Sequence, residues 1–158
     1  MKNLIKTTIL ALSLVVSSVT FAQDRMANNV DNNSTIHLQG YSPVSYLDLG
    51  IAQKGLKEFK SVHEKITYYF TSAEQKVTFD KNPNKYKPQY GGFCAFGTYA
   101  GAKFRPDPNK FIIKGGKYFL FLYDLNLDAQ QLWLNEKKHT KLVAGADKNW
   151  KKLSKTFN

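Results

Sequence analysis

The stretch KFIIKGGKYFLFLY, residues 110–123, decides the fold. Its two apolar arms, 110–114 and 117–123, flank Gly115 and Gly116. Two adjacent glycines supply the positive φ angles that a two-residue turn between antiparallel strands requires. The arms are rich in aromatic and β-branched side chains, which favour strands that pack on a core. The stretch therefore predicts a β-hairpin whose strands belong to the core.

A second hairpin is expected upstream. Segments 58–62 and 65–71 surround the pair His63-Glu64, which we expect to form the turn. The second arm contains the run Ile66 to Phe70, in which β-branched and aromatic residues predominate. Two hairpins of this kind indicate antiparallel pairing, since parallel strands need a long crossover connection.

Helical segments are expected on both sides of the hairpins. Ser42 can cap a helix, Pro43 suits its first position, and Gly50 ends it. Ser72 followed by Gln75 is a capping-box pattern. The expected helices cover residues 43–50, 72–82, 92–99, 127–137 and 147–155. The order of these segments predicts an α+β domain with a small antiparallel sheet flanked by short helices.

The N-terminal residues have the layout of a secretory signal peptide. A short basic head precedes an apolar run over 8–16, and the small residues Thr20 and Ala22 suit a cleavage site. We therefore expect a signal peptide over 1–22 and a periplasmic or secreted protein. The alternative is an uncleaved anchor, but the run is shorter than the roughly 20 residues of a membrane span. No later stretch has that length, so we expect no transmembrane segment after cleavage.

The segment that follows is polar and rich in Asn. Residues 23–35 are expected to form a flexible tether, and residues 36–158 a single domain. That domain is long enough to bury a core without disulfides.

The charge is strongly basic, with a formal net charge of +11. The lysines are spread along the chain, and Arg25 and Arg105 are its two arginines. Export and the lack of an arginine cluster argue against a nucleic-acid partner. The charge instead favours contact with anionic components of the cell envelope.

The chain has one cysteine, Cys94, so it cannot form an internal disulfide. Gly91 and Gly92 precede it and could place it in the first turn of a helix, where the helix dipole lowers the pKa of a thiol. The aromatic neighbours Tyr90 and Phe96 suit the opposite interpretation, a small buried hydrophobic residue. A reactive thiol, a metal ligand and a core residue all remain open at this point.

The three histidines, His37, His63 and His139, lie far apart and show no metal-ligand spacing. His37 is the best candidate to join Cys94 in a metal site, because it lies where the ordered domain is expected to begin. A pocket with Cys94 at its floor would be lined by the glycine-aromatic segment and its neighbour. The expected lining residues are Tyr41, Tyr90, Gly91, Gly92 and Phe93.

Several motifs match a known family in the right order. They include GYSPVSY at 40–46, FDKNPNKY at 79–86 and PQYGGFCA at 88–95. The run 40–152 thus resembles the YHS domain, in particular its exported bacterial branch. The resemblance implies that metal-associated members carry thiolates at the positions of Ser45, Thr71 and Gln75. None of these is a cysteine here, so the usual soft-metal site of the family is not expected.

No second carboxylate lies at a suggestive spacing from Asp107, and no nucleophile motif or phosphate-binding loop occurs, so no catalytic residue is assigned. We expect a binding domain more than an enzyme. The first hypothesis is soft-metal handling at Cys94, with copper or zinc as the ion. The alternatives are a thiol redox protein that exchanges with an envelope thiol partner through Cys94, and a structural or partner-binding module without a ligand site.

Overall fold

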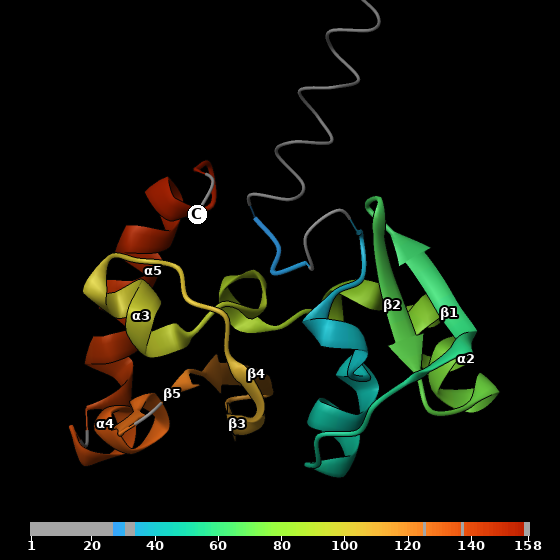
Figure 1. Cartoon of the computed structure of the whole chain (residues 1–158), viewed down its shortest axis with the longest axis horizontal. Coiled ribbons are helices and arrows are strands. Elements are labelled where there is room, and N and C mark those ends of the chain that lie inside the picture. Colours follow the sequence, from blue (N-terminus) through green and yellow to red (C-terminus); the bar gives the residue numbers. More distant parts are fainter. Residues whose placement is uncertain (1–26, 31–33, 125, 137, 157–158) are drawn as a thin grey trace, which may run out of the picture.

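The computed structural model describes residues 27–30, 34–124, 126–136 and 138–156. Within these residues, short helices alternate with three two-stranded antiparallel sheets, which confirms the expected α+β class (Figure 1). The strands are β1 (Leu56–His63), β2 (Ile66–Phe70), β3 (Asp107–Lys114), β4 (Lys117–Phe121), β5 (Tyr123–Asp124) and β6 (Leu127–Asp128). The helices are η1 (Leu38–Gly40), η2 (Ser45–Leu49), α2 (Ala73–Lys81), η3 (Pro83–Tyr86), η4 (Gln89–Gly92), α3 (Ala95–Ala100), α4 (Ala129–Asn135) and α5 (His139–Leu153). The signal peptide expected over 1–22 lies outside the described residues.

The β3–β4 hairpin forms as the sequence predicts. Lys114 pairs with Lys117, and Gly115 and Gly116 form the turn with φ angles of 61° and 70°. Strand β4 ends at Phe121, two residues before the expected end, and Tyr123 pairs in β5 instead. The four residues from Tyr118 to Phe121 are all buried, because elements cover both faces of this strand.

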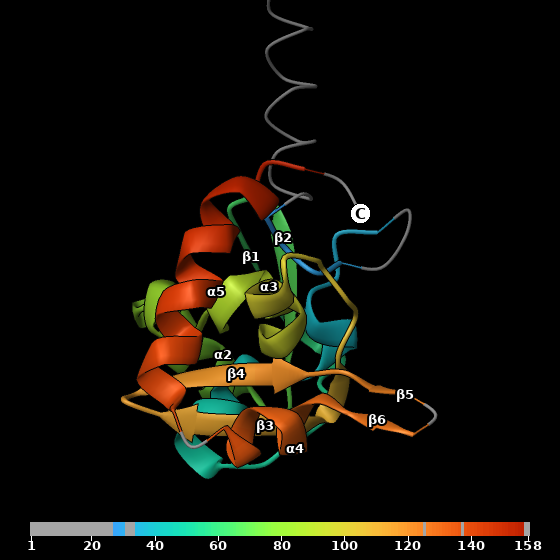
Figure 2. The same ribbon diagram turned by 90° about the vertical axis from the view of Figure 1, so that its left-hand side faces the viewer.

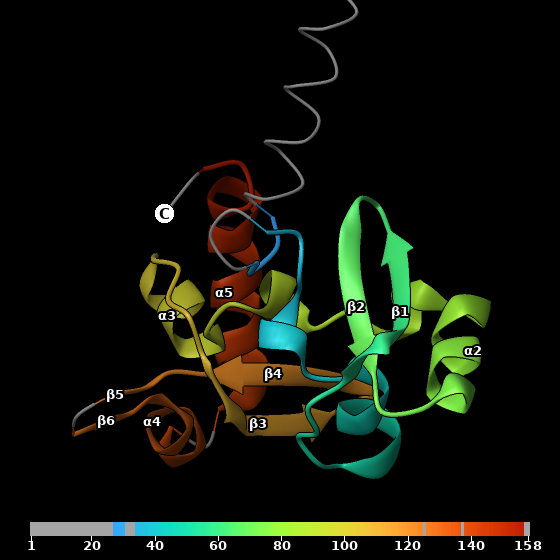
Figure 3. The same ribbon diagram turned by 45° about the vertical axis from the view of Figure 1, so that its right-hand side comes forward.

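The β1–β2 hairpin also forms, with its turn one residue later than expected. His63 pairs with Ile66, and Glu64 and Lys65 form the turn with φ angles of 49° and 61°. Helix α2 covers this hairpin through Phe79, whose ring lies 4.7 Å from that of Tyr68. Figure 3 shows the hairpin and α2 together on one side of the molecule.

The last two helices begin at different residues from those expected. Residues 127 and 128 form β6, so α4 starts at Ala129 after its cap. Helix α5 starts eight residues before the expected residue 147 and packs along α3 (Figure 2). Gly145 lies inside it, where a Cβ would stand 2.7 Å from the ring of Tyr99. The glycine therefore permits close helix packing and does not end the helix.

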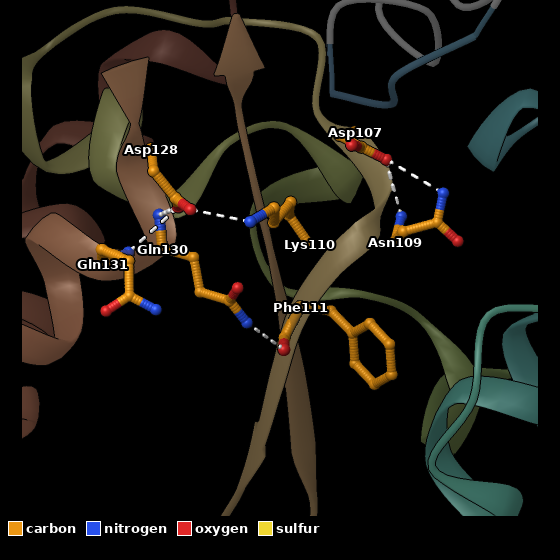
Figure 4. Close-up of polar contacts among 7 residues, drawn as sticks. All are labelled: Asp107, Asn109, Lys110, Phe111, Asp128, Gln130 and Gln131. Carbon is orange, nitrogen blue, oxygen red and sulfur yellow. Dashed lines mark hydrogen bonds and ion pairs between the residues drawn. The ribbon is translucent and has the colours of Figure 1, made fainter. Parts of the chain in front are cut away.

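Asp128 fixes the start of α4 against β3 (Figure 4). Its carboxylate accepts hydrogen bonds of 3.1 Å from the backbone N–H groups of Gln130 and Gln131. It also pairs with Lys110 of β3 at 2.7 Å, and the Gln130 amide donates to the Phe111 carbonyl at 2.6 Å. The Asp128 carboxylate thus caps α4 and also holds β3 through Lys110.

Stacked tyrosines connect the two sides of the molecule. Tyr46 of η2 stacks on Tyr118 of β4, with ring centroids 5.1 Å apart. The Tyr118 hydroxyl donates to the Tyr86 carbonyl at 2.9 Å, and the Tyr46 hydroxyl donates to the Pro108 carbonyl at 2.8 Å. These contacts join the part of the molecule that contains the β1–β2 hairpin and α2 to the part that contains α3 and α5, with β4 between them.

Candidate functional site

The glycine-aromatic segment forms a strained backbone loop at η4. Tyr90, Gly91 and Gly92 all have positive φ angles, of 54°, 59° and 83°. Glycine adopts this conformation freely, but a residue with a Cβ such as Tyr90 does so at a cost of about 1–2 kcal/mol. Leu38 and Gln39 in η1 have positive φ angles as well. A buried histidine connects these two unusual segments.

That histidine is His37, whose side chain is 1% exposed. Its Nε2 donates to the Gly91 carbonyl at 2.8 Å, because a carbonyl can only accept. Nδ1 is therefore the unprotonated nitrogen, and it has no partner among the residues that the structure describes. Burial lowers the pKa of His37 to about 4, against the opposing effect of the Gly91 bond, and the charge of Lys87 lowers it further. The ring is neutral at physiological pH.

The chain before His37 is docked on the same loop. The Asn29 backbone N–H donates to the Gly91 carbonyl at 2.8 Å, and its side-chain amide donates to the Gly92 carbonyl at 3.1 Å. Val30 forms a β-bridge with His37. Asn29 and Val30 belong to the segment expected to be a tether, as does Thr35, which pairs with Thr67, and the structure places all three in contact with the domain. The physical reason is that the Gly91 and Gly92 carbonyls need hydrogen-bond donors, and Asn29 supplies them.

Cys94 lies in the core next to this loop. It is 1% exposed, bridges to Leu120 of β4 and packs in the cluster that contains Phe119 and Trp133. It is the N-cap of α3, and its Sγ accepts a hydrogen bond of 3.3 Å from the Gly97 backbone N–H. The expected placement at a helix start is thus found. The expected lowering of the Cys94 pKa is not found. Burial raises the pKa of the thiol by more than the hydrogen bonds from backbone N–H groups lower it.

The residues expected to line a pocket lie in different surroundings. Tyr41 lies under Lys54, whose Nζ is 5.1 Å from its ring centroid. Tyr90, Gly92 and Phe93 are buried, and the Tyr90 hydroxyl donates to Asp147 at 3.1 Å. Gly91 alone among the five lines the cavity of about 200 Å³ beside η4. The aromatic rings here serve the core, which is the commoner use of large rings in a small domain.

The three positions at which the family resemblance places thiolates lie together. The Gln75 amide donates to the Ser45 hydroxyl at 3.0 Å, and its carbonyl oxygen accepts from the Thr71 backbone N–H at 3.2 Å. The Ser42 hydroxyl also donates to Gln75 at 2.7 Å, and the Ser45 hydroxyl donates to Gln53 at 2.8 Å. These groups satisfy one another within a partly buried network. Spacing along the chain indicated no such network, and only the resemblance to YHS domains pointed to three of its members.

The candidate metal ligands do not gather into a larger cluster in the described part of the chain. Within the described residues, no group of three or more His, Cys, Asp and Glu side chains could hold a metal ion. His37 and Cys94 engage different backbone partners, Gly91 and Gly97. His139 accepts from the Trp133 indole N–H at 3.0 Å, and its ring lies edge-on to that of Phe119.

Across the described residues, every helix is too short or too polar to cross a bilayer. No family model, curated protein or solved structure matches this chain. The candidate functions therefore depend on the residues and their geometry.

Proposed function

We propose that this chain is an exported, YHS-like module that binds a partner at its surface, and that Cys94 is a core residue without a metal or redox role. The observation that carries the proposal is the burial of the Cys94 thiol at the junction of α3 and β4. Three lines of chemical reasoning support it.

The first concerns the protonation state of Cys94. The thiolate, and not the thiol, attacks disulfides and binds metals. Burial raises the pKa of Cys94, so the thiolate fraction at neutral pH is smaller than that of a free cysteine. A 1% exposed side chain also gives a partner thiol no route to the sulfur. Both features oppose the redox alternative.

The second concerns the network around Gln75. Gln75 contacts the Ser45 hydroxyl and the Thr71 backbone N–H, so the three positions are neighbours in the fold, as ligands of one metal ion would have to be. This supports the residue-by-residue resemblance to YHS domains. Hydroxyl and amide groups are poor replacements for thiolates toward copper or zinc. The same positions therefore hold a neutral hydrogen-bond network, and the donors there do not fit a soft metal.

The third concerns His37. Its Nδ1 is a buried acceptor without a protein partner in the described part of the chain, which is the one observation that favours a metal site. Structural zinc usually has four protein ligands and catalytic zinc three. The free imidazole nitrogen and the Cys94 thiol make at most two donors, which is fewer than zinc takes. Burial also opposes formation of the thiolate that Cu(I) would need.

Metal competition tests the proposal. Cu(I) and Zn(II) are each held by a coloured chelator of micromolar affinity, and the exported protein is added in excess. We expect no withdrawal of either ion by the wild type, and the same result for Cys94→Ala and His37→Gln, because one open imidazole nitrogen and one buried, protonated thiol do not make a sufficient ligand set. Withdrawal of one equivalent by the wild type that is lost in Cys94→Ala would restore the soft-metal hypothesis.

A further inference from the structure

The outer surface of α5 carries a concentrated positive charge. Lys141, Lys148, Lys151 and Lys152 are all exposed, and we call them the α5 basic face. At about 100° per residue, their spacing puts the four side chains within roughly 100° of the helix circumference. They extend over about 16 Å of the helix axis at 1.5 Å per residue.

The opposite side of α5 holds the helix in a fixed orientation. Leu142 and Ala146 are buried in the core on that side. Gly145, at the edge of the basic face, lies directly against Tyr99 of α3. Figure 2 shows α5 at the outside of the molecule, next to α3 and above the β3–β4 hairpin. The lysines are therefore presented to the surroundings by a rigid element.

Ion pairs of the described residues leave this charge unneutralised. Asp147 is the one acidic residue of α5, and it accepts the hydrogen bond from Tyr90. None of the four lysines of the α5 basic face forms an ion pair with any residue in the described ranges, whereas Lys76 of α2 pairs with Asp80 at 2.6 Å. The face thus has free charge for a partner of opposite sign.

We infer that the α5 basic face docks the protein on an anionic phospholipid bilayer, with the lysine ammonium groups contacting lipid phosphates. This inference rests on the proposed function and names its partner class. The cavities beside Trp133, Gly91 and Val77 are not lined by these lysines, which stand exposed on a helix face and so suit a flat partner. Ammonium groups act as point charges without directional recognition, whereas specific binding of nucleic acid or phosphorylated groups usually employs arginine. Neither Arg25 nor Arg105 belongs to α5.

The test measures co-sedimentation of the exported protein with vesicles of phosphatidylcholine alone or with added phosphatidylglycerol. We expect binding only to the anionic vesicles, and weaker binding as salt rises, since exposed charges are screened. Replacement of all four lysines of the α5 basic face by glutamine should weaken binding several hundred-fold, because each lysine near an anionic surface is worth about fivefold. Glutamine keeps the helix propensity close to that of lysine.

The matched control removes the same charge elsewhere. Lys57, Lys60, Lys81 and Lys117 are exposed on other elements, and their replacement by glutamine should weaken binding less than tenfold. Equal loss in the two variants would overturn the inference, as would equal binding to neutral vesicles or tighter binding to a soluble acidic polysaccharide or single-stranded DNA. Each of these outcomes leaves the metal competition result unchanged, so failure of the docking surface is distinguishable from failure of the proposed function.

Discussion

Burial, more than residue type, determines the chemistry of Cys94 and His37. The glycine pair before Cys94 correctly indicated a position at a helix start, where the dipole favours a thiolate. The sequence could not decide whether the sulfur is exposed, because the same aromatic neighbours suit a pocket and a core. Whether the sulfur is exposed depends on β4, a strand some 25 positions later in the chain that covers Cys94.

His37 makes the stability of the protein depend on pH. The pKa of His37 is about 4 in the folded chain, below the ordinary value of 6.5. As pH falls, the unfolded chain takes up the proton first, so stability is complete above 6.5 and is lost progressively toward 4. We expect His37 to reduce the free energy of unfolding by about 2 kcal/mol between pH 7 and pH 5. Urea unfolding at both values of pH measures the loss.

The variants His37→Gln and His63→Gln separate this effect from other histidines. The first should remove most of the pH dependence between 7 and 5, and the second should retain it.

The paired carboxylate Glu64, whose pKa is lowered chiefly by its hydrogen bond from Lys87, contributes stability above its ordinary value of 4.5. That contribution is lost only at lower pH, outside this window. A His37→Gln variant with the slope of the wild type would disprove the assignment.

Local signals predicted the regular elements well. Gly115-Gly116 and the apolar arms around it sufficed for the β3–β4 hairpin, and Ser72 indeed caps α2. The start of α5 was missed, because Gly145 is unfavourable for a helix unless a close neighbour requires it. The docking of Asn29 was missed for a different reason. The partners of Asn29 are backbone carbonyls. Because every residue has a carbonyl, the residue types of the loop do not show which carbonyls are available to bind another segment.

Two glycine substitutions test the docking of the N-terminal segment. Gly91 and Gly115 have nearly the same φ angle, +59° and +61°. A Cβ at Gly91 would stand 1.8 Å from the Ala27 carbonyl oxygen, while a Cβ at Gly115 meets no atom within 4 Å. Alanine at either site should cost about 1–2 kcal/mol of backbone strain. Only Gly91→Ala should also displace the segment around Asn29.

Hydrogen exchange at the Asn29 amide is the measurement that distinguishes them. In Gly91→Ala we expect this amide to exchange much faster than in the wild type, because its bond to the Gly91 carbonyl is lost. Gly115→Ala should leave the exchange rate unchanged. Equal protection of Asn29 in both variants would show that the segment does not depend on contact with Gly91.

At the scale of the whole molecule, the tertiary arrangement separates the residues that the sequence grouped. Tyr41 lies on the η1–η2 side and contacts Lys54, whereas Tyr90 and Phe93 pack with Trp150 of α5. Sequence proximity to Cys94 therefore does not indicate a shared pocket. The α5 basic face could not be predicted either, since its orientation depends on which side of α5 meets α3 and the core.

The packing around β4 implies that exposure of Cys94 requires loss of the core. The Tyr46–Tyr118 stack joins the two sides of the molecule at this strand, and Cys94 bridges to Leu120 of the same strand. Opening near Cys94 should therefore coincide with global unfolding and not with a local fluctuation.

The labelling rate of Cys94 by a thiol reagent at increasing urea concentrations tests this most directly. We expect labelling in native buffer to be about a thousand-fold or more slower than in the unfolded chain. The rate should rise with urea with the same slope as global unfolding followed by tryptophan fluorescence. Labelling of the native protein at the rate of a free thiol, without dependence on urea, would contradict the account and return Cys94 to the surface as a reactive group.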